Sequence, residues 1–391
     1  MARSILDNLE QLTGKTLLVR VDFNCPLAEG QVADSTRIDR VLPGLKKLTD
    51  AGARLVLLSH LGRPKGQRLP QFSLQPVCDY LSSALGYSVP LLAEPVAAER
   101  PAAGKIVMLE NLRFWPEEEA NDQGFAARLA ALGDIYVNDA FSCAHRAHAS
   151  TDALARLLPA FAGPVMVTEL QAVGAALEDP QRPVAAVVGG AKVSTKLDVL
   201  THLIDKVDIL LLGGGMANTF LAAKGMDMGA SLMEPDLIDT AADIIAAADK
   251  KGCKLMLPED GLAAVEFKAG AAHRHIPNHA ILNAEMMLDI GPTAISHYQE
   301  ALAGARTVLW NGPMGAFEIA PFDRATVALA RTVASATQAG ELLSVAGGGD
   351  TVAALNHAGV TEQFSYVSLA GGAFLEYIEG KTLPGVAVLA E

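Results

Sequence analysis

Short runs of aliphatic residues recur along this chain, and a longer segment with helical periodicity separates each run from the next. The runs are hydrophobic without alternation, which indicates strands buried on both faces, as in a parallel sheet covered by helices. The runs lie at residues 17–21, 54–58, 106–109, 135–137, 184–188, 209–212, 254–257, 307–309 and 342–345. Strands alternating with helices predict a doubly wound α/β architecture. There are too many runs for one sheet, so we expect two.

The expected boundary between the two domains is a helix and not a flexible linker. Residues 164–177 carry apolar side chains at helical spacing, among them Val165, Leu170 and Val173. A helix between two domains is typical of a hinge built from structured elements. We therefore expect two doubly wound parallel-sheet (Rossmann-like) domains joined by a hinge helix, with the division near residue 165.

Composition excludes several classes of protein. Half of the 391 residues are hydrophobic, so the chain can bury large cores and is not expected to be disordered. Four scattered cysteines form no C-x-x-C pair, which disfavours a zinc or disulfide framework and favours a reducing compartment. No signal peptide is visible in residues 1–7, and no apolar run is long enough to cross a bilayer. We expect a cytoplasmic protein without a membrane partner.

The formal net charge of −13 is spread unevenly. Residues 1–165 hold 17 Lys and Arg against 18 Asp and Glu, whereas residues 166–391 hold 14 against 26. An acidic chain is an unfavourable partner for nucleic acid. The Arg-rich first half is compatible with a small anionic ligand.

Polar residues follow the aliphatic runs of the first half, where ligands bind in open α/β sheets. His60 lies after one run, and Arg63, Arg113 and Arg146 follow separate runs, the last with His145 beside it. Guanidinium groups bind carboxylate and phosphate through paired hydrogen bonds. A single arginine in such a place usually forms a surface ion pair. Three of them, joined by two histidines, favour a site for a small, multiply anionic ligand.

Glycine clusters follow the runs of the second half. They lie at residues 189–190, 213–215, 311–315, 347–349 and 371–372. Such turns let backbone N–H groups and helix N-termini approach phosphates. Lys192 and Lys196 are expected at i and i+4 of one helix, and Asp350 is either a helix N-cap or a ligand of nucleotide-bound Mg²⁺. A small-acid site and a nucleotide site together predict a phosphotransferase whose domains close.

The usual nucleotide-binding motifs are absent from the sequence. Gly14-Lys15-Thr16 resembles the end of a phosphate-binding loop, but Leu9 replaces the upstream glycine and a strand follows instead of preceding. No G-x-G-x-x-G occurs, because Asn218 stands where the last glycine should be. The G-x-S-x-G motif of serine hydrolases does not occur either. A nicotinamide-dependent dehydrogenase is therefore disfavoured, and nucleotide binding must use another arrangement.

Seven strings along nearly the whole chain resemble the phosphoglycerate kinase family. They are VRVDFN (19–24), SHLGRP (59–64), LENLRF (109–114), AHRAHAS (144–150), GGAKVSTK (189–196), NGPMGAFE (311–318) and GGGDT (347–351). The resemblance implies reversible phosphoryl transfer between 1,3-bisphosphoglycerate and ADP, giving 3-phosphoglycerate and ATP in glycolysis and gluconeogenesis. It also implies a cytoplasmic monomer. The alternative is a catalytically silent relative that binds a nucleotide or phosphoglycerate, and the retained Arg37, Lys192, Lys196 and Asp350 argue against it.

The resemblance also implies site residues. It places phosphoglycerate in an N-terminal domain, residues 1–165, and the nucleotide in a C-terminal domain, 166–371, with a tail, 372–391, packing back on the first. The implied substrate-binding residues are Asp22, Asn24, Arg37, His60, Arg63, Arg113, His145 and Arg146. The implied nucleotide-binding residues are Gly190, Ala191, Lys192, Lys196, Gly214, Asn311, Pro313, Glu318, Gly348, Gly349, Asp350 and Thr351. Arg37, Lys192, Gly371 and Gly372 are implied to be catalytic, and Asp350 to hold Mg²⁺ through the nucleotide.

The sequence departs from the family pattern at three places. Ser142-Cys143 follow Phe141 where the family usually has a glycine, Cys25 replaces a common valine, and Leu369-Ala370 replace Thr-Gly. An alanine at a position that needs positive φ costs about 1 kcal/mol or more, whereas elsewhere it is harmless. Because Gly371 and Gly372 remain, we expect the harmless case at Ala370.

Overall fold

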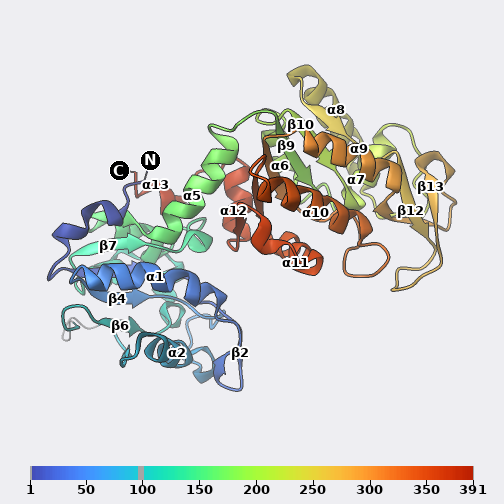
Figure 1. The fold of residues 1–391 in the computed structure, drawn as a ribbon. Coiled ribbons are helices and arrows are strands. Elements are labelled where there is room, and N and C mark those ends of the chain that lie inside the picture. The colour runs from blue at the N-terminus through green and yellow to red at the C-terminus, as the bar shows by residue number, and fades with distance from the viewer. Residues whose placement is uncertain (1, 96–100, 391) are drawn as a thin grey trace. The chain divides into compact units, whose positions relative to one another are not determined.

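The chain divides into two units, and the division falls inside a helix. The computed structural model describes residues 2–95 and 101–390 (Figure 1). Unit 1 consists of Met1–Leu170 with Thr382–Glu391, and unit 2 of Gln171–Lys381. Helix α5 (Pro164–Leu177) is continuous across the boundary. The chain therefore passes between the units twice, once within α5 and once after Lys381.

Unit 1 is built on a sheet whose pairings are all parallel among the described residues. Its strand order is β5 (Leu91–Leu92), β6 (Ile106–Leu109), β4 (Arg54–Leu58), β1 (Thr16–Arg20), β7 (Ile135–Asn138) and β8 (Ala160–Ala162). On one face, Leu17 and Leu55 pack against helices α1 (Thr36–Asp50) and α2 (Gln75–Leu85). The strand order reverses beside β1, so the loops after β1, β4, β6 and β7 meet at one edge.

The C-terminal residues complete unit 1. Helix α13 (Pro384–Ala387) lies against the segments that follow β7. Asn138 Nδ2 donates a hydrogen bond to the carbonyl oxygen of Gly385 (3.0 Å), and the Gly385 N–H donates to the carbonyl oxygen of Ala144 (2.8 Å). Residues more than two hundred positions apart in sequence therefore share one core.

Unit 2 has a second parallel sheet. Its order is β11 (Lys254–Met256), β10 (Ile209–Leu212), β9 (Val184–Val188), β15 (Thr307–Asn311), β16 (Leu343–Gly347) and β17 (Tyr366–Ser368). The helices that accompany it are α6 (Leu197–Leu203), α7 (Gly214–Ala223), α8 (Ile238–Lys251), α9 (Pro292–Ala303), α10 (Arg324–Gln338), α11 (Gly349–Ala358) and α12 (Gly372–Ile378). One core joins Val187, Val308 and Trp310 of the strands to Tyr298 of α9 and Leu329 of α10.

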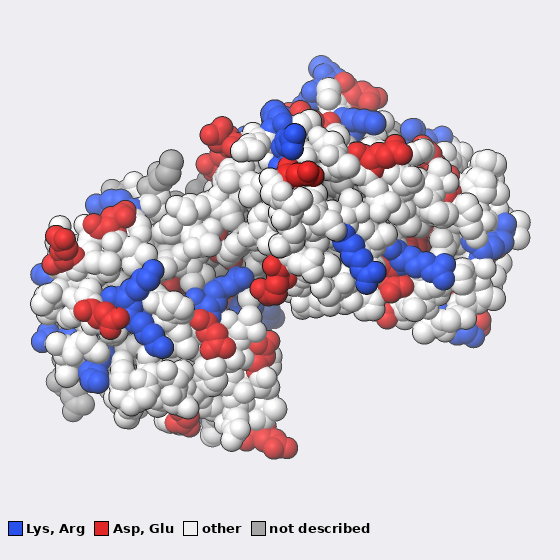
Figure 2. Space-filling view, in the orientation of Figure 1, with Lys and Arg blue, Asp and Glu red and all other residues white. Residues whose placement is uncertain are grey.

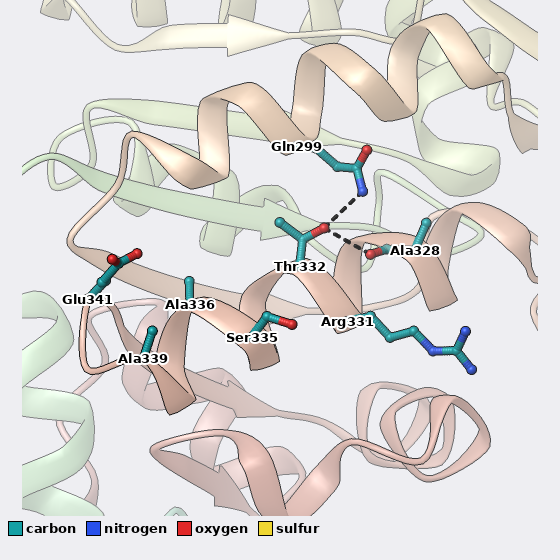
Figure 3. A pocket seen from close by; sticks show the side chains of 8 residues that line it. All are labelled: Gln299, Ala328, Arg331, Thr332, Ser335, Ala336, Ala339 and Glu341. Carbon is teal, nitrogen blue, oxygen red and sulfur yellow. Dashed lines mark hydrogen bonds between the residues drawn. The ribbon is translucent and has the colours of Figure 1, made fainter.

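A shallow groove of about 620 Å³ runs between α9 and α10 (Figure 3). Gln299 Nε2 donates to Thr332 Oγ1 (2.9 Å), which links the two helices. Glu341 at one end of the groove comes just before β16. The groove therefore lies toward the amino ends of the strands, away from the edge where ligands are expected.

Unit 2 also contains an antiparallel sheet that the sequence analysis did not predict. Strands β13 (His273–Pro277), β12 (Asp260–Ala264) and β14 (Met286–Ile290) pair in that order. The physical reason for the miss is β13, which is exposed except at Ile276 and so carries no aliphatic run. The predicted α/β class with two parallel sheets is confirmed. In the part of the chain that the structure describes, no helix is long and apolar enough to cross a membrane.

Candidate functional sites

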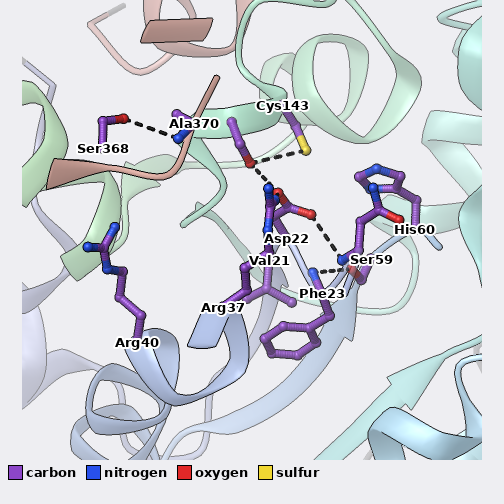
Figure 4. A network of polar contacts seen from close by, with 12 residues as sticks. Val21, Asp22, Phe23, Arg37, Arg40, Ser59, His60, Cys143, Ser368 and Ala370 are labelled. Carbon is purple, nitrogen blue, oxygen red and sulfur yellow. Dashed lines mark hydrogen bonds and ion pairs between the residues drawn. The ribbon is translucent and has the colours of Figure 1, made fainter. Parts of the chain in front are cut away.

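Asp22 lies at the centre of the polar cluster in unit 1 (Figure 4). It follows β1 and is 9% exposed. Its carboxylate accepts hydrogen bonds from Ser142 Oγ (2.5 Å) and the Asn24 N–H (3.1 Å), and forms an ion pair with Arg37 of α1. Burial alone would raise the pKa of Asp22, but the guanidinium of Arg37 and these hydrogen bonds lower it below its ordinary value. Asp22 is therefore held as a carboxylate.

The loop after β4 is tied to two neighbouring strand ends. The Gly62 N–H donates to Asn24 Oδ1 (2.9 Å), and Arg113 Nη1 donates to the Gly62 carbonyl oxygen (2.6 Å). Arg113 is buried, whereas Arg63 is exposed. The loop is thus fixed in place while Arg63 remains accessible to a ligand.

His60 and His148 are neutral at physiological pH. Burial, followed by the nearby Arg20, holds the pKa of His60 well below its usual range. Burial and the same arginine lower the pKa of His148 to about 4. The exposed Arg146 donates through Nε to His145 Nε2 (3.1 Å). Arginine side chains, and not His60 or His148, therefore supply positive charge in this cluster.

The eight predicted substrate-binding residues all belong to unit 1, on the loops after β1, β4, β6 and β7 and on α1. Contacts join Asp22 with Arg37, and Asn24 with Arg113 through Gly62. The sequence analysis missed two residues of this cluster, Ser142 and the buried Arg20. Arg20 carries a sequence signal that could have found it, because it is a charged residue inside an otherwise aliphatic run.

The site of unit 2 is made of glycine turns packed backbone against backbone. The Gly189 N–H donates to the Asn311 carbonyl oxygen (3.0 Å), and the Gly214 N–H donates to that of Met314 (2.7 Å). A Cβ at Gly189 would lie 1.9 Å from the Pro313 oxygen. Gly312 has a φ of +100°, and a Cβ there would lie 2.2 Å from the Gly189 oxygen. These turns exclude any side chain.

Asn311 and Thr351 hold the neighbouring turns in position. Asn311 Nδ2 donates to the Gly347 carbonyl oxygen (2.7 Å), and Thr351 Oγ1 accepts from the Gly312 N–H (2.8 Å). The N-cap of α11 is Gly348, and Asp350 lies exposed in the first turn. Asp350 is therefore not the N-cap, and its carboxylate is accessible at the helix N-terminus.

The expectation that Lys192 and Lys196 occupy one helix is wrong. Helix α6 begins at Leu197 with Lys196 as its N-cap residue, and Lys192 lies in the preceding turns. The Ser194 N–H and Oγ both donate to the Glu234 carboxylate (3.0 and 2.5 Å), which holds this segment outside the helix. Burial lowers the pKa of Lys196 to about 8 in spite of Asp350 nearby.

The turn after β17 bears on the departure at Leu369-Ala370. Positive φ falls on Gly371 (50°) and not on Ala370. The Ala370 N–H donates to Ser368 Oγ (3.1 Å), as Figure 4 shows. Ala370 therefore meets the condition under which we expect it to be harmless. The other predicted residues also lie in unit 2. Gly190, Ala191, Pro313 and the exposed Glu318 lie on loops that follow strands, and Gly349 and Gly372 are the first residues of α11 and α12.

Surface charge gives no sign of a nucleic-acid interface on the face drawn in Figure 2. Basic and acidic side chains of the described residues are interspersed there over both units. An extended basic patch is the electrostatic footprint that nucleic-acid binding requires.

Comparisons of the sequence and of the structure with known proteins point to the same family. The family model described as phosphoglycerate kinase matches residues 6–381. The chain is 56% identical over 390 residues to the phosphoglycerate kinase of Methylobacterium radiotolerans, with 98% of each chain covered. It is 54% identical to that of Rhizobium meliloti over the full length of both. It is also similar to the solved phosphoglycerate kinase of Coxiella burnetii, with a TM-score of 0.96, 43% identity and coverage of 100% and 99%.

Proposed function

The chain belongs to the phosphoglycerate kinase family, and on that premise we propose how its two units share the reaction. The enzyme is a phosphotransferase with a carboxyl group as acceptor, and interconverts 1,3-bisphosphoglycerate and ADP with 3-phosphoglycerate and ATP. We assign phosphoglycerate to unit 1 and the nucleotide to unit 2. The observation that supports this assignment is the contrast between arginine side chains in the first site and bare glycine turns in the second.

In unit 1, the arginines at the strand ends bind the anionic groups of phosphoglycerate. Arg63 and Arg146 are exposed and free to form bidentate contacts with a phosphate or carboxylate, supported by Arg113, His60 and His145. Asp22 is a carboxylate and can only accept hydrogen bonds. It therefore binds the hydroxyl group of the substrate, with Asn24 beside it.

In unit 2, backbone N–H groups receive the nucleotide. The turns at Gly190-Ala191, Gly214, Asn311-Pro313 and Gly348-Gly349 leave room for phosphates and the base. Lys192 and Lys196 bind phosphate oxygens, and Thr351 lies at the N-terminus of α11, where anions are favoured. Glu318 accepts hydrogen bonds from the ribose hydroxyls.

Asp350 is suited to hold Mg²⁺ through the nucleotide. Mg²⁺ usually binds one or two carboxylates and takes its remaining ligands from substrate phosphates and water. Asp350 offers one exposed carboxylate beside the proposed phosphate site, which fits that donor set. When bound, the ion would neutralise charge on the phosphate oxygens.

The transfer itself needs no covalent enzyme intermediate. In the direction of ATP use, a carboxylate oxygen of 3-phosphoglycerate bonds to the γ-phosphorus, and the bond from that phosphorus to the ADP oxygen breaks. Arg37, Lys192 and the backbone N–H groups of Gly371 and Gly372 stabilise the charge on the transferring group. We further propose that α5 is the hinge about which the units close to exclude water, and that the enzyme works as a cytoplasmic monomer.

A coupled assay of ATP consumption with 3-phosphoglycerate tests the activity, and calorimetry on the full chain tests the division of sites. Arg63→Ala should weaken 3-phosphoglycerate binding by about tenfold or more and leave ADP binding unchanged. Lys192→Ala should do the reverse. If either variant weakened both ligands equally, the assignment of one ligand to each unit would be wrong.

A further inference from the structure

Arg20 is a buried cation at the end of β1, 2% exposed, and it donates in three directions. Its Nε donates to Ser150 Oγ (2.9 Å), its Nη1 to the carbonyl oxygen of Val21, and its Nη2 contacts His60 Nδ1 (3.1 Å). A buried charge is costly unless it is paired and hydrogen-bonded. The buried guanidinium of Arg20 therefore needs a negatively charged group close by.

That partner is Glu118 of the short helix α3 (Pro116–Glu119), which is 1% exposed. Its carboxylate accepts from Ser150 Oγ (2.6 Å) and from the Ser150 N–H (3.0 Å). The hydroxyl of Ser150 has one proton, which goes to Glu118, so its oxygen is left to accept from Arg20. The hydrogen bonds therefore lead away from Arg20 on both sides, through Ser150 to Glu118 and directly to His60.

The donation from Arg20 fixes the position of the proton on His60. A guanidinium group has donors and no acceptor, so the Nδ1 atom of His60 must be the acceptor. The ring proton then lies on Nε2. The charged and titratable groups around the ring are Arg20, Asp22, Arg113, Cys143 and His148. Burial and the cations among them outweigh Asp22 and keep the pKa of the imidazole well below its usual range.

We propose that Arg20, held by Ser150 and Glu118, is a positioning residue that keeps His60 in the neutral tautomer with its proton on Nε2. This tautomer offers one N–H to an anionic oxygen. The opposite tautomer would present a lone pair there and repel the anion. The inference rests on the proposed role of His60 in binding phosphoglycerate, but the tautomer itself does not depend on that role.

The first test is ¹⁵N-edited NMR of the imidazole groups in the unliganded full-length protein between pH 6 and 8. The signal of His60, assigned with His60→Gln, should show a protonated Nε2 and a bare Nδ1 at every pH. A protonated Nδ1 or a mixture of tautomers would overturn the proposal. The tautomer is measured on the unmodified chain, and His60→Gln serves only to assign the signal.

The second test removes the donor. Arg20→Gln should give a mixture of His60 tautomers, raise the pH at which His60 titrates, and raise the KM for 3-phosphoglycerate about tenfold with less effect on kcat. Arg20→Lys should raise the KM for 3-phosphoglycerate less than Arg20→Gln does. Ser150→Ala is a milder change and should also give a mixture of His60 tautomers in the NMR spectrum. Arg128→Gln, an exposed arginine of the same unit, is the control and should change neither quantity.

The outcomes distinguish the positioning role of Arg20 from the proposed binding of phosphoglycerate at His60. An altered tautomer with an unchanged KM for 3-phosphoglycerate would overturn the positioning role. If the His60 tautomer is as expected but His60→Gln also leaves that KM unchanged, the placement of phosphoglycerate at His60 is wrong, while Arg20 still sets the ring.

Discussion

The two ligand sites that we propose lie at the same edge of similar sheets but are built by opposite means. Unit 1 fills its strand-end loops with charged side chains held by hydrogen bonds, as Asp22 and Arg113 are. Unit 2 removes side chains so that the turns at Gly189 and Gly312 pack backbone against backbone. The first site is therefore damaged by taking atoms away, and the second by adding them. The predictions below test that difference.

Adding a methyl group to unit 2 should have the largest effect. Gly312→Ala places a Cβ 2.2 Å from the Gly189 oxygen at a φ of +100°. Overpacking and the strained φ together should cost about 3 kcal/mol of stability and weaken ADP binding more than about a hundredfold. Thermal unfolding and calorimetry measure both. Gly304→Ala, where the nearest atom is 3.6 Å away, is the matched control and should behave like the parent. Normal ADP binding in Gly312→Ala would contradict the backbone site.

Removing a charge from unit 1 should have the next largest effect. Arg37→Ala takes away the ion pair with Asp22 and the proposed partner of the transferring phosphoryl group. We expect kcat to fall about 10²-fold, as when single charge-stabilising groups are lost elsewhere, with little change in KM. Steady-state kinetics measure this. Lys47→Ala, on an exposed part of the same helix, should leave kcat unchanged. A normal kcat for Arg37→Ala would remove this residue from the mechanism.

The pH dependence of the two sites should differ. The folded pKa of Lys196 is lowered to about 8, so the free enzyme loses this positive charge as the pH rises through that value. ADP affinity should fall about tenfold between pH 7.5 and 9, because the lysine must regain its proton to bind phosphate. The affinity for 3-phosphoglycerate should stay constant, since arginines remain charged in this range.

Calorimetry at several pH values measures both affinities. Lys196→Arg should make ADP binding independent of pH over the same range. An equal loss of affinity for both ligands in the parent enzyme would contradict the distinction between the units.

The smallest effect should come from restoring the family residues in the last turn of unit 2. Leu369→Thr with Ala370→Gly changes two positions at which φ is not positive, so no strain is relieved. We expect kcat to change less than about tenfold, and nearer to twofold, on the same scale as other conformationally compatible substitutions. A gain of more than a hundredfold would show that this chain is an impaired enzyme.

Much of the fold was predictable because buried parallel strands leave continuous aliphatic runs such as 184–188. Strand β13 was missed because its side chains are mostly polar and exposed. The local sequence also wrongly predicted that Lys192 lies in a helix. The structure differs because Glu234, forty residues away, binds Ser194 and holds this segment outside the helix. The contact of Arg20 with Ser150 spans 130 residues, and no local pattern specifies such a pair. Sequence therefore located the strand ends but not the hydrogen-bond networks behind them.

The path of the chain also has a consequence for synthesis. Unit 2 is one continuous stretch, Gln171–Lys381, whereas unit 1 needs Gly385 to bond with Asn138 and Ala144. The segment around Gly385 is made only after the whole of unit 2. Although most of unit 1 is made first, it therefore cannot complete its native contacts until the residues of unit 2 have been translated.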